Sequence, residues 1–319
     1  MTNIALSAAD PDAKALTAEI LELWNRNIGR SFPLDERLYR QQLSLESDEM
    51  TIIAARKGAD IPGAQSAQPG KLQGAALVKR SRRTGASGLV PHLGNLSFIL
   101  VDKEDRRRGI GSSLLSASEA WLKERSASVL TLGQDRYHFF PGCPLGGEGS
   151  EAEGFAALAS FLSARGFSLG DEESDLAADL KSLDLKALAA RAPLAPGFSF
   201  RLYDPSLRPS LHAFLERNFP SRWLEDTFEA LDAGMRGVDL ALLTEDKSGE
   251  VVGFSRIYDE NSPILGPGVY WRALMGAAPG GLGPIGVDAG KRGLGLGLAL
   301  LRCCVEELAN RGVRTMEAP

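Results

Sequence analysis

The chain has 319 residues and a formal net charge of −5, with 44% hydrophobic and 24% charged residues. These values are ordinary for a soluble globular protein, and the length favours two domains over one. The scattered basic residues exclude a sustained basic face of the kind that binds nucleic acid, and no apolar run is long enough to span a membrane.

The first residues carry neither the pattern of a secretory signal nor that of an Arg-rich transit peptide, so we expect a cytoplasmic protein. Cys303 and Cys304 are adjacent and cannot easily bridge to each other. No Cys or His pair has the spacing of a zinc site, and we therefore expect reduced thiols and no bound metal.

Hydrophobic periodicity in the first half predicts alternating strands and helices. In chain order the pattern predicts a strand at 3–7, helices at 12–27 and 33–43, strands at 50–57, 71–81 and 94–102, a helix at 109–125, a strand at 128–133, a helix at 155–167 and a last strand near 173–180.

The second half repeats this order after a proline-ended connector. The pattern predicts a strand at 198–205, helices at 206–219 and 222–234, paired strands at 238–246 and 250–259, and then a strand, a Gly-rich turn and a helix within 283–313.

Two Gly-rich segments align between the halves. Setting "VDKEDRRRGIGSSLL" over "VDAGKRGLGLGLALL" places Arg106 over Arg292, and it also pairs two glycines of each segment, Gly109 with Gly295 and Gly111 with Gly297. The matching frame indicates an internal duplication.

A strand that enters a helix through a glycine turn leaves the first helical N–H groups unpaired, with the positive end of the helix dipole behind them. Glycine lets an oxyanion approach the backbone, and arginine adds charged donors, so each turn is suited to a phosphate-bearing ligand.

The segment lacks the Gly-Lys-Ser/Thr of a P-loop. A dinucleotide-binding fingerprint fits poorly, because Leu114 stands where its last glycine is required.

The pattern Arg-x-x-Gly-x-Gly occurs at 106–111 and again at 292–297. Here the sequence resembles the GNAT family of acetyl-CoA-dependent N-acyltransferases, over most of residues 1–183 and part of 198–319. The resemblance implies two α/β domains, each with a mixed, mostly antiparallel sheet flanked by helices. We expect an N-terminal domain at 1–183, a linker at 184–197, and a C-terminal domain at 198–319 that is truncated or degenerate, because the sequence stops as the next strand begins.

In this family the turn binds the pyrophosphate of acetyl-CoA, and the preceding strand pairs with the pantetheine arm. The resemblance therefore implies a donor site formed by Leu100, Val101, Arg106, Arg107, Arg108, Gly109, Ile110, Gly111 and Ser112, with Arg292, Gly295 and Gly297 as the corresponding residues of the second copy.

The family's usual proton donor to the CoA thiolate is a tyrosine, and Leu162 stands at that position in "FLSARGF". Tyr137 and His138 lie just past the strand at 128–133, and Tyr137 is the better-matched acid. Deprotonating an ammonium substrate needs a base or a water chain, for which Glu104 and Asp102 are the nearest carboxylates in sequence.

The resemblance implies direct transfer of an acetyl group to a primary amine of a small molecule or a peptide, with a backbone amide of the fourth strand stabilising the oxyanion. The acceptor and the oligomeric state are open. The missing tyrosine and the incomplete second copy also allow a non-catalytic CoA-binding sensor or scaffold, and a nucleotide-binding module of the Rossmann type is a third reading.

Overall fold

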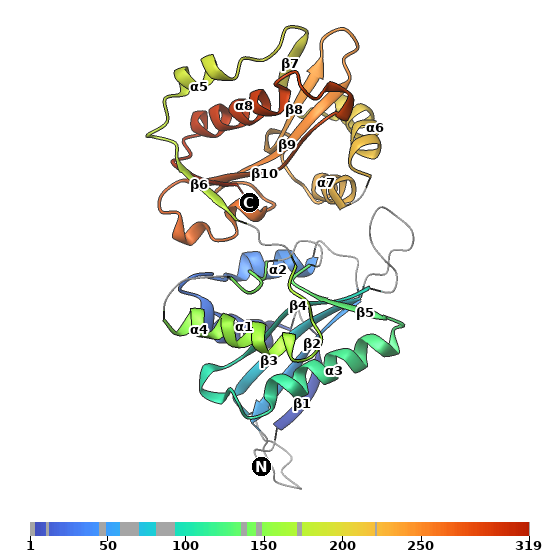
Figure 1. Ribbon diagram of the computed structural model, residues 1–319, viewed down its shortest axis with the longest axis vertical. Helices are drawn as coiled ribbons and strands as arrows, with labels where there is room; N and C mark the ends of the chain where they lie inside the picture. The colour runs from blue at the N-terminus through green and yellow to red at the C-terminus, as the bar shows by residue number, and fades with distance from the viewer. Residues whose placement is uncertain are drawn as a thin grey trace. The chain divides into compact units, whose positions relative to one another are not determined.

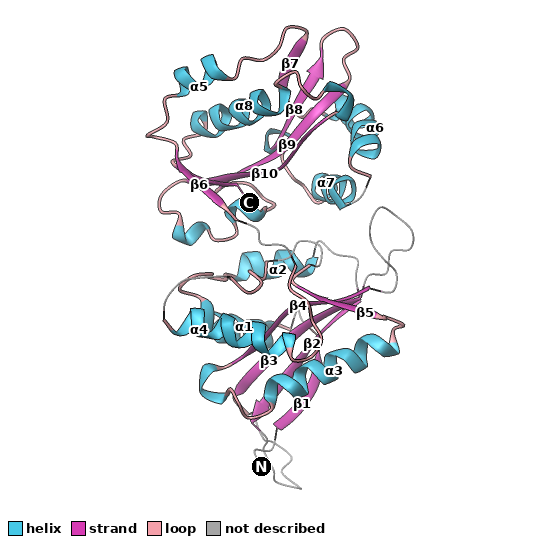
Figure 2. Cartoon of the chain, in the orientation of Figure 1, coloured by secondary structure: helices cyan, strands magenta, loops and turns pink. Residues whose placement is uncertain are grey.

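The computed structural model describes residues 4–10, 13–44, 49–57, 70–80, 93–134, 139–144, 149–170, 174–220 and 222–318. These residues form two compact units, one up to residue 170 and one from residue 174 onward. In each unit a mixed sheet is flanked by helices (Figures 1 and 2).

The first unit contains a sheet with the strand order β1-β2-β3-β4-β5, antiparallel throughout except for the parallel pair β4–β5. Its elements are β1 (Ile4–Ala9), α1 (Lys14–Ile28), α2 (Glu36–Ser44), β2 (Glu49–Lys57), β3 (Leu72–Arg80), β4 (Leu93–Val101), α3 (Ile110–Glu124), β5 (Val129–Leu132) and α4 (Ser150–Ser163).

Helices cover the central strands of this sheet on both faces. Leu114 and Leu122 of α3 pack against Val78 of β3 on one face. On the other face Trp24 of α1 is fully buried against Phe98 of β4, with their rings edge to face. This two-sided cover explains why β3 and β4 are nearly continuous runs of buried residues instead of alternating ones.

The second unit has the strand order β6-β11-β10-β9-β8-β7, with β10–β11 parallel and the other pairs antiparallel. Its elements are β6 (Leu176–Asp179), α5 (Leu185–Arg191), β7 (Phe198–Leu202), α6 (Arg208–Asn218), α7 (Arg222–Asp232), β8 (Leu240–Glu245), β9 (Val251–Asp259), β10 (Pro279–Val287), α8 (Leu296–Asn310) and β11 (Thr315–Ala318).

Two segments belong to the second unit, although the sequence placed one of them in the first domain and the other in the linker. The strand expected to end the first domain is β6, which pairs with β11 from Leu176↔Ala318 to Asp179↔Thr315. The predicted linker contains α5, whose Leu185 and Leu188 pack against the core beneath α8. The division therefore falls between residues 170 and 174 instead of at 183.

The physical reason lies at the edge of the second sheet. An edge strand presents unpaired N–H and C=O groups, and β6 satisfies those on one side of β11. The second unit thus receives an edge strand and a covering helix from the chain that precedes it. The edge of the sheet beside β11 is therefore closed by β6.

The duplication is visible in a salt bridge that recurs at the end of a central strand. Arg26, near the end of α1, donates to Asp102 Oδ2 at 2.6 Å, and Arg217, near the end of α6, donates to Asp288 Oδ2 at the same 2.6 Å. The next residue along each helix is an asparagine that accepts a backbone N–H from the following turn, in the first unit from Lys103 at 2.8 Å and in the second from Ala289 at 2.9 Å. We call each of these arrangements the strand-end clamp.

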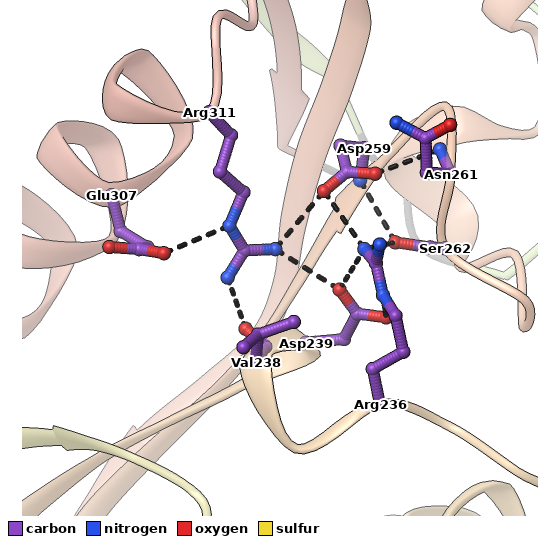
Figure 3. A network of polar contacts seen from close by, with 8 residues as sticks. All are labelled: Arg236, Val238, Asp239, Asp259, Asn261, Ser262, Glu307 and Arg311. Atoms are coloured by element: carbon purple, nitrogen blue, oxygen red, sulfur yellow. Dashed lines mark hydrogen bonds and ion pairs between the residues drawn. The ribbon is translucent and has the colours of Figure 1, made fainter.

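The second unit also contains a network of two arginines around two buried aspartates (Figure 3). Arg236 Nη2 lies 2.6 Å from Asp239 Oδ1 and 2.9 Å from Asp259 Oδ2, and Arg311 Nη1 lies 3.1 and 3.2 Å from the same two oxygens. Arg311 also donates to the carbonyl of Val238. Because the charges balance, the network joins the C-terminal end of α8 to the end of β9 without an unpaired buried charge.

The strand-end clamp gives a test that compares the two units. Asp102 is fully buried, and its partner Arg26 is 28% exposed, whereas Arg217 in the second clamp is 53% exposed. Replacing Arg26 by methionine leaves a buried carboxylate without its main partner, and we expect a loss of about 3 kcal/mol in the free energy of unfolding. Arg217→Met is the matched control, with an expected loss of less than about 1 kcal/mol. Urea unfolding measures the free energy of unfolding of both variants. Equal losses would contradict the prediction that the more buried salt bridge contributes more.

A second test concerns pH. Burial, together with the charge of and hydrogen bond to Asp175, raises the pKa of Glu317 on β11 to about 7 from an ordinary 4.5. The folded state therefore holds this proton more tightly than the unfolded chain, and the second unit loses stability as pH rises from about 4.5 to 7.

Glu317→Gln should accordingly raise the thermal unfolding midpoint at pH values above 7 and leave it little changed near pH 4.5, the ordinary pKa. Differential scanning calorimetry across this range checks the prediction, with the exposed Glu250→Gln as the control. A wild-type midpoint that follows the same pH profile as the variant would refute it.

Candidate functional site

The turn between β4 and α3 adopts a left-handed backbone at two residues, Arg107 (φ 63°) and Gly109 (φ 85°). Gly109 is the N-cap of α3, and a Cβ placed there would meet no atom within 4 Å, so its backbone is open to a ligand. The second copy repeats the conformation at Gly293 (φ 82°) and Gly295 (φ 75°). The left-handed turn thus explains the glycines at positions 109, 293 and 295.

The first turn of α3 offers its backbone N–H groups. The first α-helical bond made from this turn is that of Ser113 N–H to the carbonyl of Gly109, at 3.0 Å. The N–H groups before it have no acceptor inside the helix, and they lie at the positive end of the helix dipole. A Cβ at Gly111 would lie 3.5 Å from the Phe161 ring, in ordinary van der Waals contact, so a side chain longer than that of alanine would meet this ring.

A cavity of about 540 Å³ lies at this turn, between the end of β4, the start of α3 and one face of α4. The residues predicted for the donor site that line it are Leu100, Val101, Arg106, Arg107, Gly109, Ile110, Gly111 and Ser112.

Other residues of the wall were missed at the level of sequence. They include Ile28 of α1, Phe140 after β5, and Phe155 and Phe161 of α4. Arg165, just beyond α4, adds a positive charge to the same wall. Three of these five lie in or just after α4, and the only local signal was the aromatic and Gly-Phe pattern of "FLSARGF".

One wall of the cavity is a free strand edge. In the described part of the chain, β5 pairs with β4 only from Leu93 to Leu96, and Gly133 N–H donates to Leu96 C=O where the strands part. A bulge interrupts the β3–β4 pairing between Leu96 and Phe98 at the same point. The later part of β4 can therefore pair with an extended ligand as with an added strand, beside a bulge that redirects the backbone.

The three arginines of the turn have different surroundings. Arg106 is directed inward, where its Nε donates to the carbonyl of Val101 at 3.1 Å and its Nη2 to Asn27 Oδ1 at 3.4 Å. Arg108 is paired with Asp105 at 3.0 Å and does not line the cavity. Arg107 is exposed, with no hydrogen bond or ion pair to the described residues, and is the one whose charge is free for a ligand.

The two carboxylates considered as bases lie apart from the cavity wall. Burial by itself raises the pKa of Asp102, but the hydrogen bond from Glu104 N–H and the charge of Arg26 outweigh it and lower that pKa. Asp102 therefore remains ionised within the strand-end clamp. Glu104 is 69% exposed, lies 3.6 Å from Lys71 Nζ and is not among the residues that line the cavity.

The predicted acids Tyr137 and His138 lie outside the described residues. The chain that follows them is described, and Phe140 lines the cavity. Leu162, at the position of the family tyrosine, is only 5% exposed, and its neighbour Phe161 lines the cavity instead.

The second copy has the same turn conformation as the first but different side chains around it. Leu294 and Leu298 stand at the positions of Arg108 and Ser112, and they are 51% and 53% exposed. Arg292 is exposed, whereas Arg106 is half-buried. The second turn therefore retains its glycines and backbone, and it has leucines where the first has one arginine before the helix and one serine in the first helical turn.

A short 3-10 segment, Pro267–Val269, packs on the second sheet over β10 and β11. A Cβ on Gly281 would lie 2.4 Å from the carbonyl oxygen of Gly268, so the two backbones are in direct contact. Leu282, the next residue of β10, packs in the core beneath α8, which places the segment on the face opposite α8. Val269 is fully buried there.

Two of the thiols lie in the interior of the second unit. Cys303 and Cys304 are unpaired and buried in α8. Burial raises the pKa of Cys304 to about 12. Within the described ranges, no group of His, Cys, Asp and Glu is arranged to hold a metal ion. In that same part of the chain, no helix has the length and apolar character needed to cross a bilayer.

Solved structures share this fold. The glucosamine N-acetyltransferase region of a fungal multi-domain β-N-acetylglucosaminidase matches with a TM-score of 0.80 and 22% identity over 99% of this chain, which spans only 35% of that protein. A tandem GNAT protein from the clavulanic acid biosynthesis pathway matches with a TM-score of 0.65 and 17% identity, covering 99% of this chain and 89% of that one. An N-acetyltransferase from Sphaerobacter thermophilus gives 0.64 and 19%, covering 99% and 85%.

At these identities the structural likeness shows the fold, and no curated protein matches the sequence. The family model for acetyltransferases of the GNAT type matches twice, at residues 18–140 and 208–318. The two matches together cover more than half of the chain, and each contains one of the glycine turns. The chain therefore belongs to the acetyltransferase (GNAT) family of acyl-transferring enzymes, with the fold present in two copies.

Proposed function

We propose that the first unit transfers an acetyl group from acetyl-CoA to a primary amine. One observation carries the proposal. A single cavity of about 540 Å³ joins the unpaired N–H groups at the start of α3 to the free edge of β4. The first feature suits a pyrophosphate, and the second suits an extended amide-containing arm.

The residues present fit acetyl-CoA at both ends. At the turn, Gly109 and Gly111 leave the backbone accessible, and Arg107 supplies a positive charge that is paired with none of the described residues. Along β4, Leu100 and Val101 form the wall that would face pantetheine. Arg106 keeps the turn attached to β4 and α1, and we assign it to holding the site in shape.

The proposed reaction is direct attack of the neutral amine on the thioester carbonyl. The C–N bond forms, the C–S bond breaks, and the thiolate takes up a proton. A backbone N–H near the β4 bulge would donate to the oxyanion. Tyr137 is our proposed acid for the thiolate, with His138 as the alternative, and Glu104 acting through water is our proposed acceptor of the ammonium proton.

The acceptor is a primary amine of a small molecule or a peptide. The solved relative named as a glucosamine N-acetyltransferase region supports including amino sugars among the first acceptors tested. The fold by itself does not select among amines, because one fold serves many substrates.

We assign the second unit to a scaffold role. Its turn presents Leu294 and Leu298 to solvent, and the segment Pro267–Val269 packs on the face of its sheet opposite α8. Arg292, Gly295 and Gly297 remain available to bind a second acetyl-CoA, and this possibility is decided by the same titration as the first site.

Acetyl-CoA binding is the first test. We expect about one acetyl-CoA bound per chain, with stabilisation against heat by acetyl-CoA and CoA and none by NAD. Gly111→Leu fills the space beside the α3 N–H groups and should abolish binding. Gly297→Leu, the matched change in the second turn, has no atom within 4 Å of its Cβ and should leave binding intact.

Isothermal titration calorimetry measures the acetyl-CoA affinity and the number of bound acetyl-CoA molecules for the wild-type chain and both variants. Unchanged affinity in Gly111→Leu would remove the first turn as the phosphate site. Stabilisation by NAD alone would overturn the acyl-CoA assignment in favour of a nucleotide module.

Turnover is the second test. Thiol release from acetyl-CoA with a panel of amines should show transfer, and Tyr137→Phe should lower kcat by roughly a hundredfold without changing acetyl-CoA affinity, because a general acid contributes to the transition state. His138→Gln should leave kcat unchanged if Tyr137 is the acid, and a loss of kcat in His138→Gln alone would assign the acid to His138. Tight acetyl-CoA binding without turnover on any amine would favour the non-catalytic sensor or scaffold.

A further inference from the structure

Arg165 lies at the rim of the cavity, two residues beyond the end of α4. Its guanidinium carbon lies 3.7 Å from the centroid of the Phe161 ring, so the group is stacked on a ring that also lines the cavity. Nη1 donates to the carbonyl of Phe161 at 2.9 Å, and Nη2 donates to Ser112 Oγ in the first turn of α3 at 2.7 Å. Phe161 thus holds the guanidinium on one side, and on the other side the guanidinium is directed to the start of α3.

In the described part of the chain no carboxylate lies within ion-pair distance of Arg165, whereas Arg108 in the turn is paired with Asp105. A cation beside a helix N-terminus is electrostatically unfavourable, because the dipole there is also positive. Two positive groups that face one cavity favour an anion between them.

The second unit shows that the contact is not needed to build the turn. The residue at the position of Ser112 is Leu298, which cannot accept a hydrogen bond from its side chain. Even so, α8 begins at the same point, with a left-handed glycine as its N-cap. The strand, turn and helix therefore form without a partner like Arg165.

We propose that Arg165 binds the pyrophosphate of acyl-CoA together with the backbone N–H groups at the start of α3. The inference rests on the proposed function of the first unit and adds to it a residue outside the glycine turn. The hydroxyl oxygen of Ser112 accepts the hydrogen bond that a phosphate oxygen would accept, and the Ser112 O–H would then donate to the same anion. The contact with the first turn of α3 assigns Arg165 to the pyrophosphate and not to the 3′-phosphate.

The test uses ligands that differ in their phosphates. CoA carries both the pyrophosphate and the 3′-phosphate, dephospho-CoA lacks the 3′-phosphate, and pantetheine has neither. For Arg165→Gln we expect Kd for CoA and for dephospho-CoA to rise by the same factor, roughly tenfold to a hundredfold, since a charge-assisted hydrogen bond is lost. The affinity for pantetheine should not change. Arg165→Lys should restore part of the binding as a point charge.

The matched control is Arg191→Gln, an exposed arginine of α5 in the second unit, which should leave all three affinities unchanged. The thermal unfolding midpoint without ligand tests whether Arg165 has only a structural role. Arg165→Gln should not lower the midpoint, because the variant removes a cation from the positive end of a helix.

The outcomes separate the inference from the proposed function. A wild-type chain that binds neither CoA nor dephospho-CoA contradicts the proposed function and removes the basis of the inference. Normal wild-type binding with no effect of Arg165→Gln overturns only the inference. A loss confined to CoA would place Arg165 at the 3′-phosphate, and an equal loss for pantetheine or a lowered unfolding midpoint would show a structural role; each of these outcomes overturns the assignment to the pyrophosphate.

Discussion

The backbone N–H groups in the first turn of α3 have no acceptor within the helix, and the first unit is arranged around this requirement. The left-handed backbone at Arg107 and Gly109 turns the chain from β4 into the helix. The strand-end clamp of Arg26 and Asp102 holds the end of β4, while the parting of β4 from β5 leaves a strand edge free next to the turn. Together these features combine a site for negative charge with an edge for an extended chain.

The two copies keep this backbone and differ in what covers it. Both have a strand-end clamp and a left-handed glycine before the helix. In the first unit α4 forms a wall of the cavity and supplies aromatic side chains and a cation. In the second unit leucines stand at the start of α8, and a 3-10 segment occupies the opposite face of the sheet. The two copies thus share the part that depends on local backbone geometry and differ in the side chains that surround it.

Glycine spacing and hydrophobic periodicity are local properties, so the sequence alone determined the family, the two copies, and nearly every helix and strand. It also identified the turn that lines the cavity, because glycines at positive φ and a helix N-terminus are both features of neighbouring residues. The strand near 173–180 was recognised as a strand for the same reason.

Only the tertiary structure decided the contacts between distant segments. It paired β6 with β11 of the second unit, because a strand's own pattern does not specify which edge it will satisfy. It placed Asp102 in a salt bridge with Arg26, 76 residues away, and so turned a possible base into a structural ion pair. It brought Arg165 to Ser112 across 53 residues. Side-chain chemistry is set by the partners that folding supplies, and those partners lie outside the range of any local pattern.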